Sequence, residues 1–256
     1  MNWQPKRAKR SAYIHVPFCR HRCGYCNFTL VAGRDDLIQD YLRALSIELS
    51  WLETPRAVDT IFVGGGTPSH LSVDQLEKFF DILRHWFILP EGNEFSVEAN
   101  PNDISYEKID LLRHRGVNRL SLGVQSFDES KLRILERDHD STTIFKCIEI
   151  CRSKLDNLSL DLIFGVPGET IEVWKTDLDS AIELPITHIS TYGLTFELGT
   201  RFWSRMNKCE LKAIDEESER SMYETAIDTL SRVARNINAP SMTIWVRFGR
   251  PRALAA

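Results

Sequence analysis

Short apolar runs alternate with longer segments of helical periodicity along most of this 256-residue chain. The helical pattern is clearest over residues 72–87, where apolar side chains recur every three or four positions. Ser72 and Gln75 have the spacing of a capping box, which predicts the first turn of this helix. The same periodicity predicts further helices over residues 35–53, 106–115, 141–153 and 171–184, and it runs through 218–231.

Six apolar or β-branched runs separate these helices and predict strands. Several runs are apolar almost throughout, which is typical of strands buried on both faces of a parallel sheet. The alternation predicts a parallel α/β fold, either open or barrel-like. Polar and glycine-rich residues follow the runs, so we expect one shared site at the carboxyl ends of the strands. The predicted strands are 12–16, 58–63, 94–99, 118–124, 158–164 and 188–192.

Composition narrows the functional classes. The chain has 32 Lys and Arg against 36 Asp and Glu, a net charge of −4, which argues against nucleic-acid binding through bulk charge. No stretch approaches the roughly 18 apolar residues of a membrane helix. The basic residues 6–10 precede no apolar segment of signal-peptide length. We therefore expect a cytoplasmic protein with no transmembrane segment.

Three of the six cysteines fall within eight residues, as Cys19, Cys23 and Cys26. In a cytosolic protein this spacing indicates metal binding before disulfide formation. Thiolates select zinc, Cu(I) or iron–sulfur clusters. A [4Fe–4S] cluster usually takes four cysteines, so three leave one iron open to a small molecule. A structural zinc site completed by His15 or His21 is the alternative.

Other residues carry weaker signals. Gly64–Gly66 indicate close backbone approach to a ligand, or a plain turn between strand and helix. Asp161 interrupts an apolar run, and because an unpartnered buried aspartate is costly, we expect it to point into the site. His139 stands between two aspartates and is expected in a solvated loop, whereas Cys147 and Cys151 are expected in the core.

Five segments, read in order with the cysteine motif, identify a family. The motif CxxxCxxC resembles that of radical S-adenosylmethionine (SAM) enzymes. The segments narrow the resemblance to the oxygen-independent coproporphyrinogen III oxidase family, over about residues 12–230. They are Tyr13-Ile-His-Val-Pro-Phe-Cys19, Gly64-Gly-Gly-Thr-Pro68, Val97-Glu-Ala-Asn-Pro101, Gly123-Val-Gln-Ser-Phe127 and Asp161-Leu-Ile-Phe-Gly-Val-Pro167.

The resemblance implies a fold and a chemistry. The fold is a partial parallel (β/α)6 TIM-like barrel of the radical SAM type. Cys19, Cys23 and Cys26 would hold a [4Fe–4S] cluster whose open iron binds the amino and carboxylate groups of SAM. An electron donor such as flavodoxin or ferredoxin would reduce the cluster, and SAM would be cleaved to methionine and a 5′-deoxyadenosyl radical. No catalytic side chain is assigned beyond the cluster and SAM.

The resemblance also implies which side chains contact SAM. The glycine segment would meet its methionine end, and Glu98 would pair with its ammonium group, although Glu98 also fits a solvated rim acid. Arg137 fits either this site or a surface position on a helix. Thr195 matches the far end of a pocket for a second SAM. The full set is Tyr13, Tyr25, Gly65, Gly66, Thr67, Glu98, Gln125, Arg137, Asp161 and Thr195.

One position divides the family. The true oxidases, which decarboxylate coproporphyrinogen III, carry a further cysteine where this chain has Phe28. Phe28 resembles the heme-chaperone branch, whose members bind heme and hand it to acceptor proteins. The prediction is therefore a heme chaperone whose partners are heme, or a porphyrinogen, and an unidentified acceptor. The alternatives are a true oxidase, a zinc-binding module and a non-functional truncated product.

The last 24 residues differ from the rest. Residues 233–256 contain four arginines and no acidic residue, and they show no clear period of 2.0 or 3.6. A basic flexible tail and an out-of-frame translation both fit this composition. The His-Asn-x-x-Tyr-Trp motif of the chaperone branch does not occur in the sequence, which leaves heme binding open. The predicted division is a basic arm over 1–11, a core over 12–232 and this tail.

Overall fold

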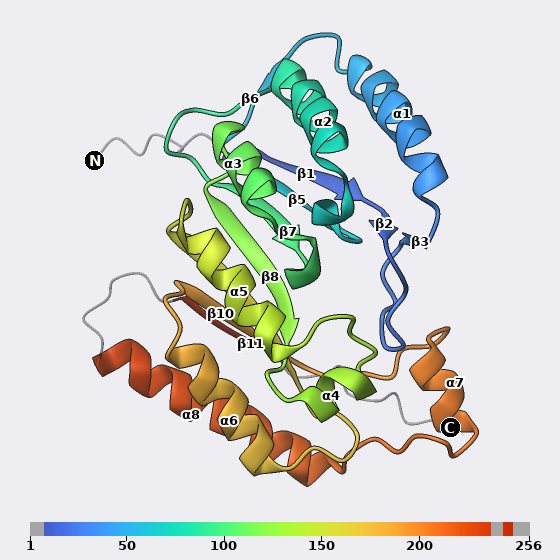
Figure 1. Ribbon diagram of the computed structural model, residues 1–256, viewed down its shortest axis with the longest axis vertical. Coiled ribbons are helices and arrows are strands. Elements are labelled where there is room, and N and C mark those ends of the chain that lie inside the picture. The colour runs from blue at the N-terminus through green and yellow to red at the C-terminus, as the bar shows by residue number, and fades with distance from the viewer. Residues whose placement is uncertain (1–7, 237–242, 248–256) are drawn as a thin grey trace, which may run out of the picture.

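The computed structural model describes the backbone of residues 8–236 and 243–247 and the side chains of residues 8–233 (Figure 1). Within these residues, seven strands form one parallel sheet in which spatial order follows sequence order. Among the described strands, β1 and β11 form the two edges of the sheet. Its strands are β1 (Ser11–Val16), β5 (Thr60–Gly65), β7 (Phe95–Ala99), β8 (Arg119–Gln125), β9 (Asn157–Phe164), β10 (His188–Gly193) and β11 (Thr243–Arg247).

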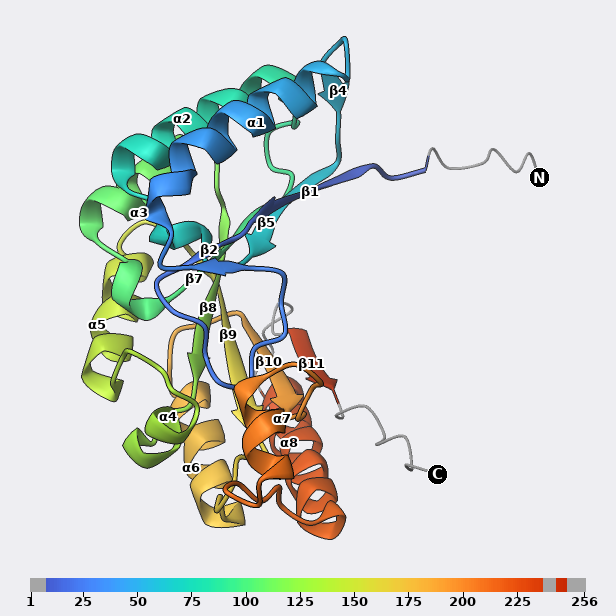
Figure 2. The same ribbon diagram turned by 90° about the vertical axis from the view of Figure 1, so that its right-hand side faces the viewer.

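Helices connect successive strands, and Figure 2 shows α1, α2, α3, α5 and α6 gathered along one side of the sheet. Crossover connections of this kind place every parallel strand in the same direction. All carboxyl ends therefore meet at one edge. The helices are α1 (Ile38–Ser50), α2 (Val73–Trp86), α3 (Tyr106–His114), α4 (Glu129–Ile134), α5 (Ser141–Arg152), α6 (Ile171–Ile182), α7 (Arg201–Asn207) and α8 (Glu216–Asn236).

Two short parallel pairs lie outside the main sheet. The pair β2–β3 closes the base of the loop that carries the three cysteines, and the Val31 N–H donates to the Pro17 carbonyl at 2.7 Å. Three 3-10 helices lie in the connections. These elements are β2 (Phe18–Cys19), β3 (Val31–Ala32), β4 (Arg56–Ala57), β6 (Phe87–Ile88), η1 (Asp35–Leu37), η2 (Pro68–His70) and η3 (Pro101–Asp103).

The hydrophobic core lies between the helices and the outer face of the sheet. The capping box predicted for α2 is confirmed, with the Gln75 N–H donating to Ser72 Oγ and the Ser72 N–H to the Gln75 side chain. The predicted core cysteines, Cys147 and Cys151, are also confirmed as buried. Apolar residues on one face of α2 pack into this core: Leu76, Phe79, Phe80 and Leu83.

The inner face of the sheet is polar. Ser121 on β8 lies in register with Glu98 on β7 and with Ser159 on β9, and Ser159 lies in register with His188 on β10. The alternate residues on the outer face, such as Leu120, are fully buried in the core. TIM barrels usually fill the interior with branched apolar side chains. The polar layer therefore marks the inner face as a ligand-binding surface rather than a second core.

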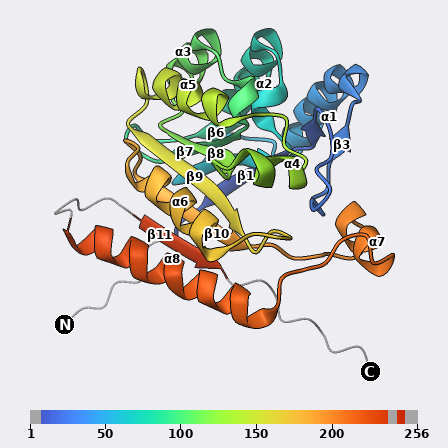
Figure 3. The same cartoon turned by 60° about the horizontal axis from the view of Figure 1, so that its bottom comes forward.

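The six predicted strands are confirmed to within two residues at each end. The strand β11 and the helices α4 and α7 were not predicted. Figure 3 shows β11 next to β10, although the sequence there has no strand periodicity. The helix α8 continues to Asn236, across the predicted boundary at 232/233, and the division into arm, core and tail stays a prediction.

Some sequence predictions concern parts of the chain that the structure leaves out. Residues 1–7 of the basic arm, and residues 237–242 and 248–256 of the tail, lie outside the described residues. Among the helices that are described, none has the length and apolar character needed to cross a membrane.

Candidate functional site

A cavity of about 620 Å³ opens at the carboxyl edge of the sheet. It is lined by twelve of the thirteen predicted site residues, and Tyr13 is the exception. Clustering from segments up to 176 residues apart follows from the parallel topology. The role of each residue stays a prediction. The twelve are Cys19, Cys23, Tyr25, Cys26, Gly65, Gly66, Thr67, Glu98, Gln125, Arg137, Asp161 and Thr195.

The cysteine loop, residues 19–32, is folded around an arginine. The Arg22 guanidinium donates to the carbonyls of Cys26, Phe28 and Leu30, at 3.3, 3.2 and 2.8 Å. The Cys26 N–H also donates to the Cys23 carbonyl at 3.1 Å. These contacts within one loop give it a defined shape.

The thiols lie in a desolvated environment. Burial raises the pKa of Cys19 to about 11, against the effect of a 3.1 Å hydrogen bond to Thr67 Oγ1. Burial likewise raises the pKa of Cys26. For both thiols, a raised pKa favours the protonated form over the thiolate that binds a metal. Binding of a metal group would release these protons.

The donor set fits an iron–sulfur cluster. Three thiols from one loop face a cavity with room for a group larger than one ion. A single zinc ion needs ligand atoms about 2.0–2.3 Å from one point. Within the described part of the chain, no three His, Cys, Asp or Glu side chains are arranged in that way. The zinc alternative gains no support from this arrangement.

The glycine segment holds the cysteine loop in place. The Gly66 N–H donates to the Val16 carbonyl and the Thr67 N–H to the Phe18 carbonyl, both at 2.8 Å. A Cβ at Gly66 would lie 2.7 Å from the Phe18 oxygen. The close approach that the sequence assigned to a ligand is therefore made, at this position, by the chain's own backbone.

Two carboxylates line the inner wall. Asp161 points into the cavity, as predicted, and accepts from Ser121 Oγ at 3.2 Å. Burial raises the pKa of Asp161 to about 6, and hydrogen bonds from Ser121 and Ser190 limit the shift. Burial also raises the pKa of Glu98, against a 3.0 Å hydrogen bond from the Gly65 N–H. Such carboxylates accept hydrogen bonds from hydroxyl or ammonium groups of a ligand.

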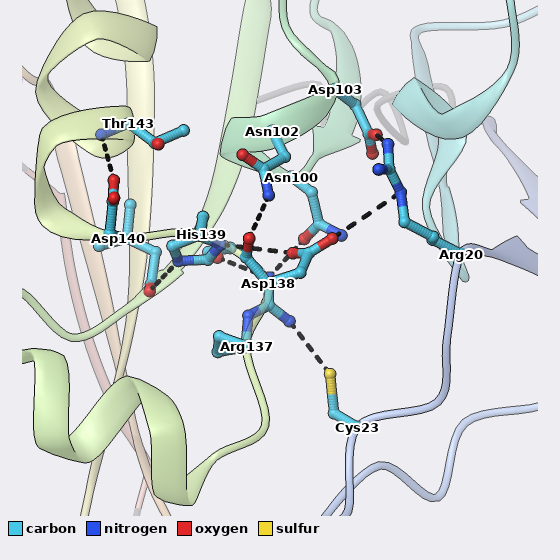
Figure 4. A network of polar contacts seen from close by, with 12 residues as sticks. Arg20, Cys23, Asn100, Asn102, Asp103, Arg137, Asp138, His139, Asp140 and Thr143 are labelled. Carbon is cyan, nitrogen blue, oxygen red and sulfur yellow. Dashed lines mark hydrogen bonds and ion pairs between the residues drawn. The ribbon is translucent and has the colours of Figure 1, made fainter.

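Arg137 is part of the cavity wall, and the alternative of a surface position on a helix is wrong. It lies between α4 and α5, and its Nη1 is 3.5 Å from both Cys23 Sγ and the Tyr25 hydroxyl (Figure 4). Its Nη2 donates to the Gly123 carbonyl at 2.9 Å and to Asn100 Oδ1. Its Nε is buried without a partner among the described residues.

The prediction of a solvated His139 is wrong. The residue is 5% exposed, and Nε2–H donates to the Val124 carbonyl at 2.9 Å. Burial and the neighbouring Arg137 lower its pKa to about 4, so the ring is neutral. Of the flanking aspartates, Asp138 faces Arg20 beside the cavity, and Asp140 caps α5. Their charge suggested solvent around the whole segment, but alternation of side chains placed the histidine inside.

Tyr13 is not brought into the cavity. Its ring stacks on Phe62 and is largely exposed, and its hydroxyl donates to His15 Nδ1 at 3.0 Å. Conversely, the sequence analysis missed Asn100, which holds both Arg137 and Thr67. The signal was present, because Asn100 belongs to the Val97–Pro101 segment that supported the family resemblance.

Comparison with known proteins gives three findings. Residues 13–181 match the model of the radical SAM superfamily. The chain is 39% identical over 227 residues to the heme chaperone HemW of Bacillus subtilis, and 38% identical over 201 residues to that of Escherichia coli. The crystal structure of E. coli coproporphyrinogen III oxidase HemN, a radical SAM enzyme, superposes with a TM-score of 0.78 at 28% identity.

The matches differ in coverage. The alignments take in 86% and 76% of this chain but only 60% and 53% of the two HemW proteins. The HemN superposition covers 88% of this chain and 53% of HemN. The chain therefore spans a little over half the length of the relatives it matches.

Proposed function

This chain belongs to the radical SAM superfamily, and from that premise we propose that it is a heme chaperone that holds a [4Fe–4S] cluster and SAM in the cavity at the carboxyl edge of its sheet. The observation that carries the cofactor part is the meeting of three thiols, a glycine segment and two buried carboxylates in one cavity. When bound, the cluster and SAM supply one-electron chemistry.

The chain's own side chains divide the work of binding. Cys19, Cys23 and Cys26 would hold the cluster. Glu98 would accept hydrogen bonds from the ammonium group of SAM. Its carboxylate lines the cavity and is held in place by the Gly65 N–H at 3.0 Å. Asp161, held by Ser121, would accept ligand hydroxyl groups. The polar inner face lets these groups bind a charged ligand without an apolar layer between them.

Two observations support the proposal that the chain binds and transfers heme. The relatives at 39% and 38% identity are named heme chaperones. Phe28 stands where the true oxidases carry a further cysteine. We propose a cytoplasmic protein that receives an electron from a donor such as flavodoxin or ferredoxin and passes heme to an acceptor protein. Reduced cysteines are the rule in that compartment.

Cluster binding is tested by anaerobic reconstitution with iron and sulfide. The wild-type protein and Cys209→Ser, which changes an exposed cysteine, should form a cluster whose electron paramagnetic resonance (EPR) signal changes on adding SAM. Cys19→Ser, Cys23→Ser and Cys26→Ser should each lose most of the iron, because three ligands cannot be reduced to two without releasing the cluster. Stoichiometric zinc and no iron in the wild-type protein would contradict the proposal.

The oxidase alternative is favoured by the HemN superposition and is separated by product analysis. With SAM, a reductant and coproporphyrinogen III, a chaperone should leave all four propionates intact, whereas an oxidase releases two molecules of carbon dioxide. Heme titration completes the comparison. Saturable heme binding with transfer to an apo-acceptor supports the chaperone, and carbon dioxide release with no heme binding overturns it.

A further inference from the structure

Arg137 contacts a predicted cluster ligand directly. Its Nη1–H group points at Cys23 Sγ, with the nitrogen and sulfur 3.5 Å apart, a hydrogen-bonding distance for sulfur (Figure 4). The guanidinium is held by other acceptors at the same time, the Gly123 carbonyl at 2.9 Å and Asn100 Oδ1. A planar guanidinium fixed by three acceptors has little freedom to turn away from the sulfur.

The segment around Arg137 is tied to the cysteine loop on both sides. The His21 Nε2–H group donates to the Glu136 carbonyl at 2.7 Å, just before Arg137. The Arg20 guanidinium lies 3.8 Å from Asp138, just after it. Three successive residues of one segment therefore each contact the loop. This arrangement holds the segment that carries the guanidinium against the loop that carries the Cys23 sulfur.

A cation beside a cluster ligand changes the energy of the added electron. A cluster gains one negative charge when a one-electron donor reduces it. Hydrogen bonds to the cysteine sulfurs stabilise that reduced state and raise the reduction potential. A guanidinium keeps its charge at every physiological pH. In a cavity partly shielded from water, its effect exceeds that of an exposed cation at a similar distance.

We propose that Arg137 sets the reduction potential of the cluster by donating a hydrogen bond to the Cys23 thiolate, independently of any contact with SAM. This role rests on the proposed binding of a cluster by the three cysteines. It makes Arg137 a tuning residue, since in this role it acts on the cluster through Cys23. Replacing its charge should make the cluster harder to reduce.

The test is a redox titration of the reconstituted full chain, followed by EPR in the absence of SAM. At the wild-type midpoint, Arg137→Gln should lower the ratio of reduced to oxidised cluster about tenfold, a shift of about 59 mV to more negative potential. Arg137→Lys keeps the charge but loses the planar guanidinium, so its midpoint potential should lie between those of the wild type and Arg137→Gln. Arg133→Gln removes an exposed cation of α4, four residues before Arg137, and its midpoint should match the wild type.

The outcomes are separable. No cluster in the wild-type protein overturns both the proposed function and this role. A cluster with the same potential in the wild type and Arg137→Gln overturns this role alone. An equal shift in Arg133→Gln and Arg137→Gln also overturns it, because bulk charge then explains the effect. If Arg137→Gln loses its cluster on purification, Arg137→Lys decides, and an unchanged midpoint in that variant contradicts the proposal.

Discussion

Asp161 shows how strand geometry can bury a carboxylate that would be more stable in water. Its neighbours Leu160 and Leu162 are fully buried in the outer core, so strand alternation turns Asp161 to the inner face. There it is held by hydroxyl groups and by no cation in direct contact among the described residues. A buried carboxylate of this kind costs stability until a ligand uses it.

Asp161→Asn should stabilise the ligand-free protein at pH 7.5. The carboxyl pKa is about 6 in the folded chain against a usual 3.8. The folded state therefore binds the proton more tightly, so the contribution of Asp161 to stability is full below about pH 4 and is lost as the pH rises through 6. The shift corresponds to at most about 3 kcal/mol. Denaturant unfolding should show this gain at pH 7.5 and little of it at pH 4.5, and equal gains at both would contradict the argument.

At the scale of elements, a buried ion network joins α4, α6 and the connection after β9. Lys131 donates to Asp177 at 2.8 Å and also to Glu169, and the side chains of all three are at most 3% exposed. Ser126 donates to Asp177 at 2.7 Å, and the Trp174 ring lies 5.0 Å from Lys131 Nζ. The network links the turns that follow β8 and β9. These two strands carry Gln125 and Ile163 of the cavity lining near their carboxyl ends.

Lys131→Met should destabilise the protein by about 3–5 kcal/mol, because it leaves two buried carboxylates without their cation. Adding Glu169→Gln should recover part of that loss by removing one of the two charges. Lys146→Met, at an exposed position of α5, is the matched control and should leave stability unchanged. Urea unfolding of the wild type and the three variants measures the free energy of unfolding. If Lys131→Met loses no more stability than Lys146→Met, the network has no structural role.

At the scale of the whole molecule, the cysteine loop joins the first and last parts of the sheet. The Phe202 N–H on α7 donates to the Gly24 carbonyl at 2.9 Å, and Arg201 donates to the Arg22 carbonyl at 2.6 Å, across 179 residues of sequence. Figures 1 and 2 both show the loop descending beside α7. The loop that lines one side of the cavity is therefore held by segments that are remote from it in the chain.

Gly24→Ala should weaken this contact. A Cβ at Gly24 would lie 2.4 Å from the Phe202 ring, which is fully buried, so the ring or the loop would have to shift. We expect faster hydrogen exchange in the cysteine loop and faster loss of a reconstituted cluster to a chelator. Combining Gly24→Ala with Phe202→Leu provides the control, because the smaller side chain makes room for the methyl group. No difference between Gly24→Ala and the wild type would show that the contact is not needed.

Much of the fold was predictable because its signals are local. The capping box of α2 spans four residues, and the six strands show as short apolar runs between helical patterns. The helix α4 was missed because it is only six residues long and lies where polar residues dominate. The strand β11 was missed because its pairing with β10, and not a periodic pattern, defines it. His139 was wrongly predicted to be solvated because two charged aspartates flank it, although its own side chain is buried.

The sequence by itself determined the parallel α/β order, the three adjacent cysteines and the glycine and acidic segments that meet at one edge. These features depend on spacing within a few residues and on the rule that parallel strands share their carboxyl ends. Only the tertiary structure decided that Arg137 contacts Cys23, that Lys131 joins Glu169 and Asp177, and that Gly24 packs on Phe202. Contacts between side chains far apart in the chain depend on how helices and loops pack over the sheet, and no local pattern records that packing.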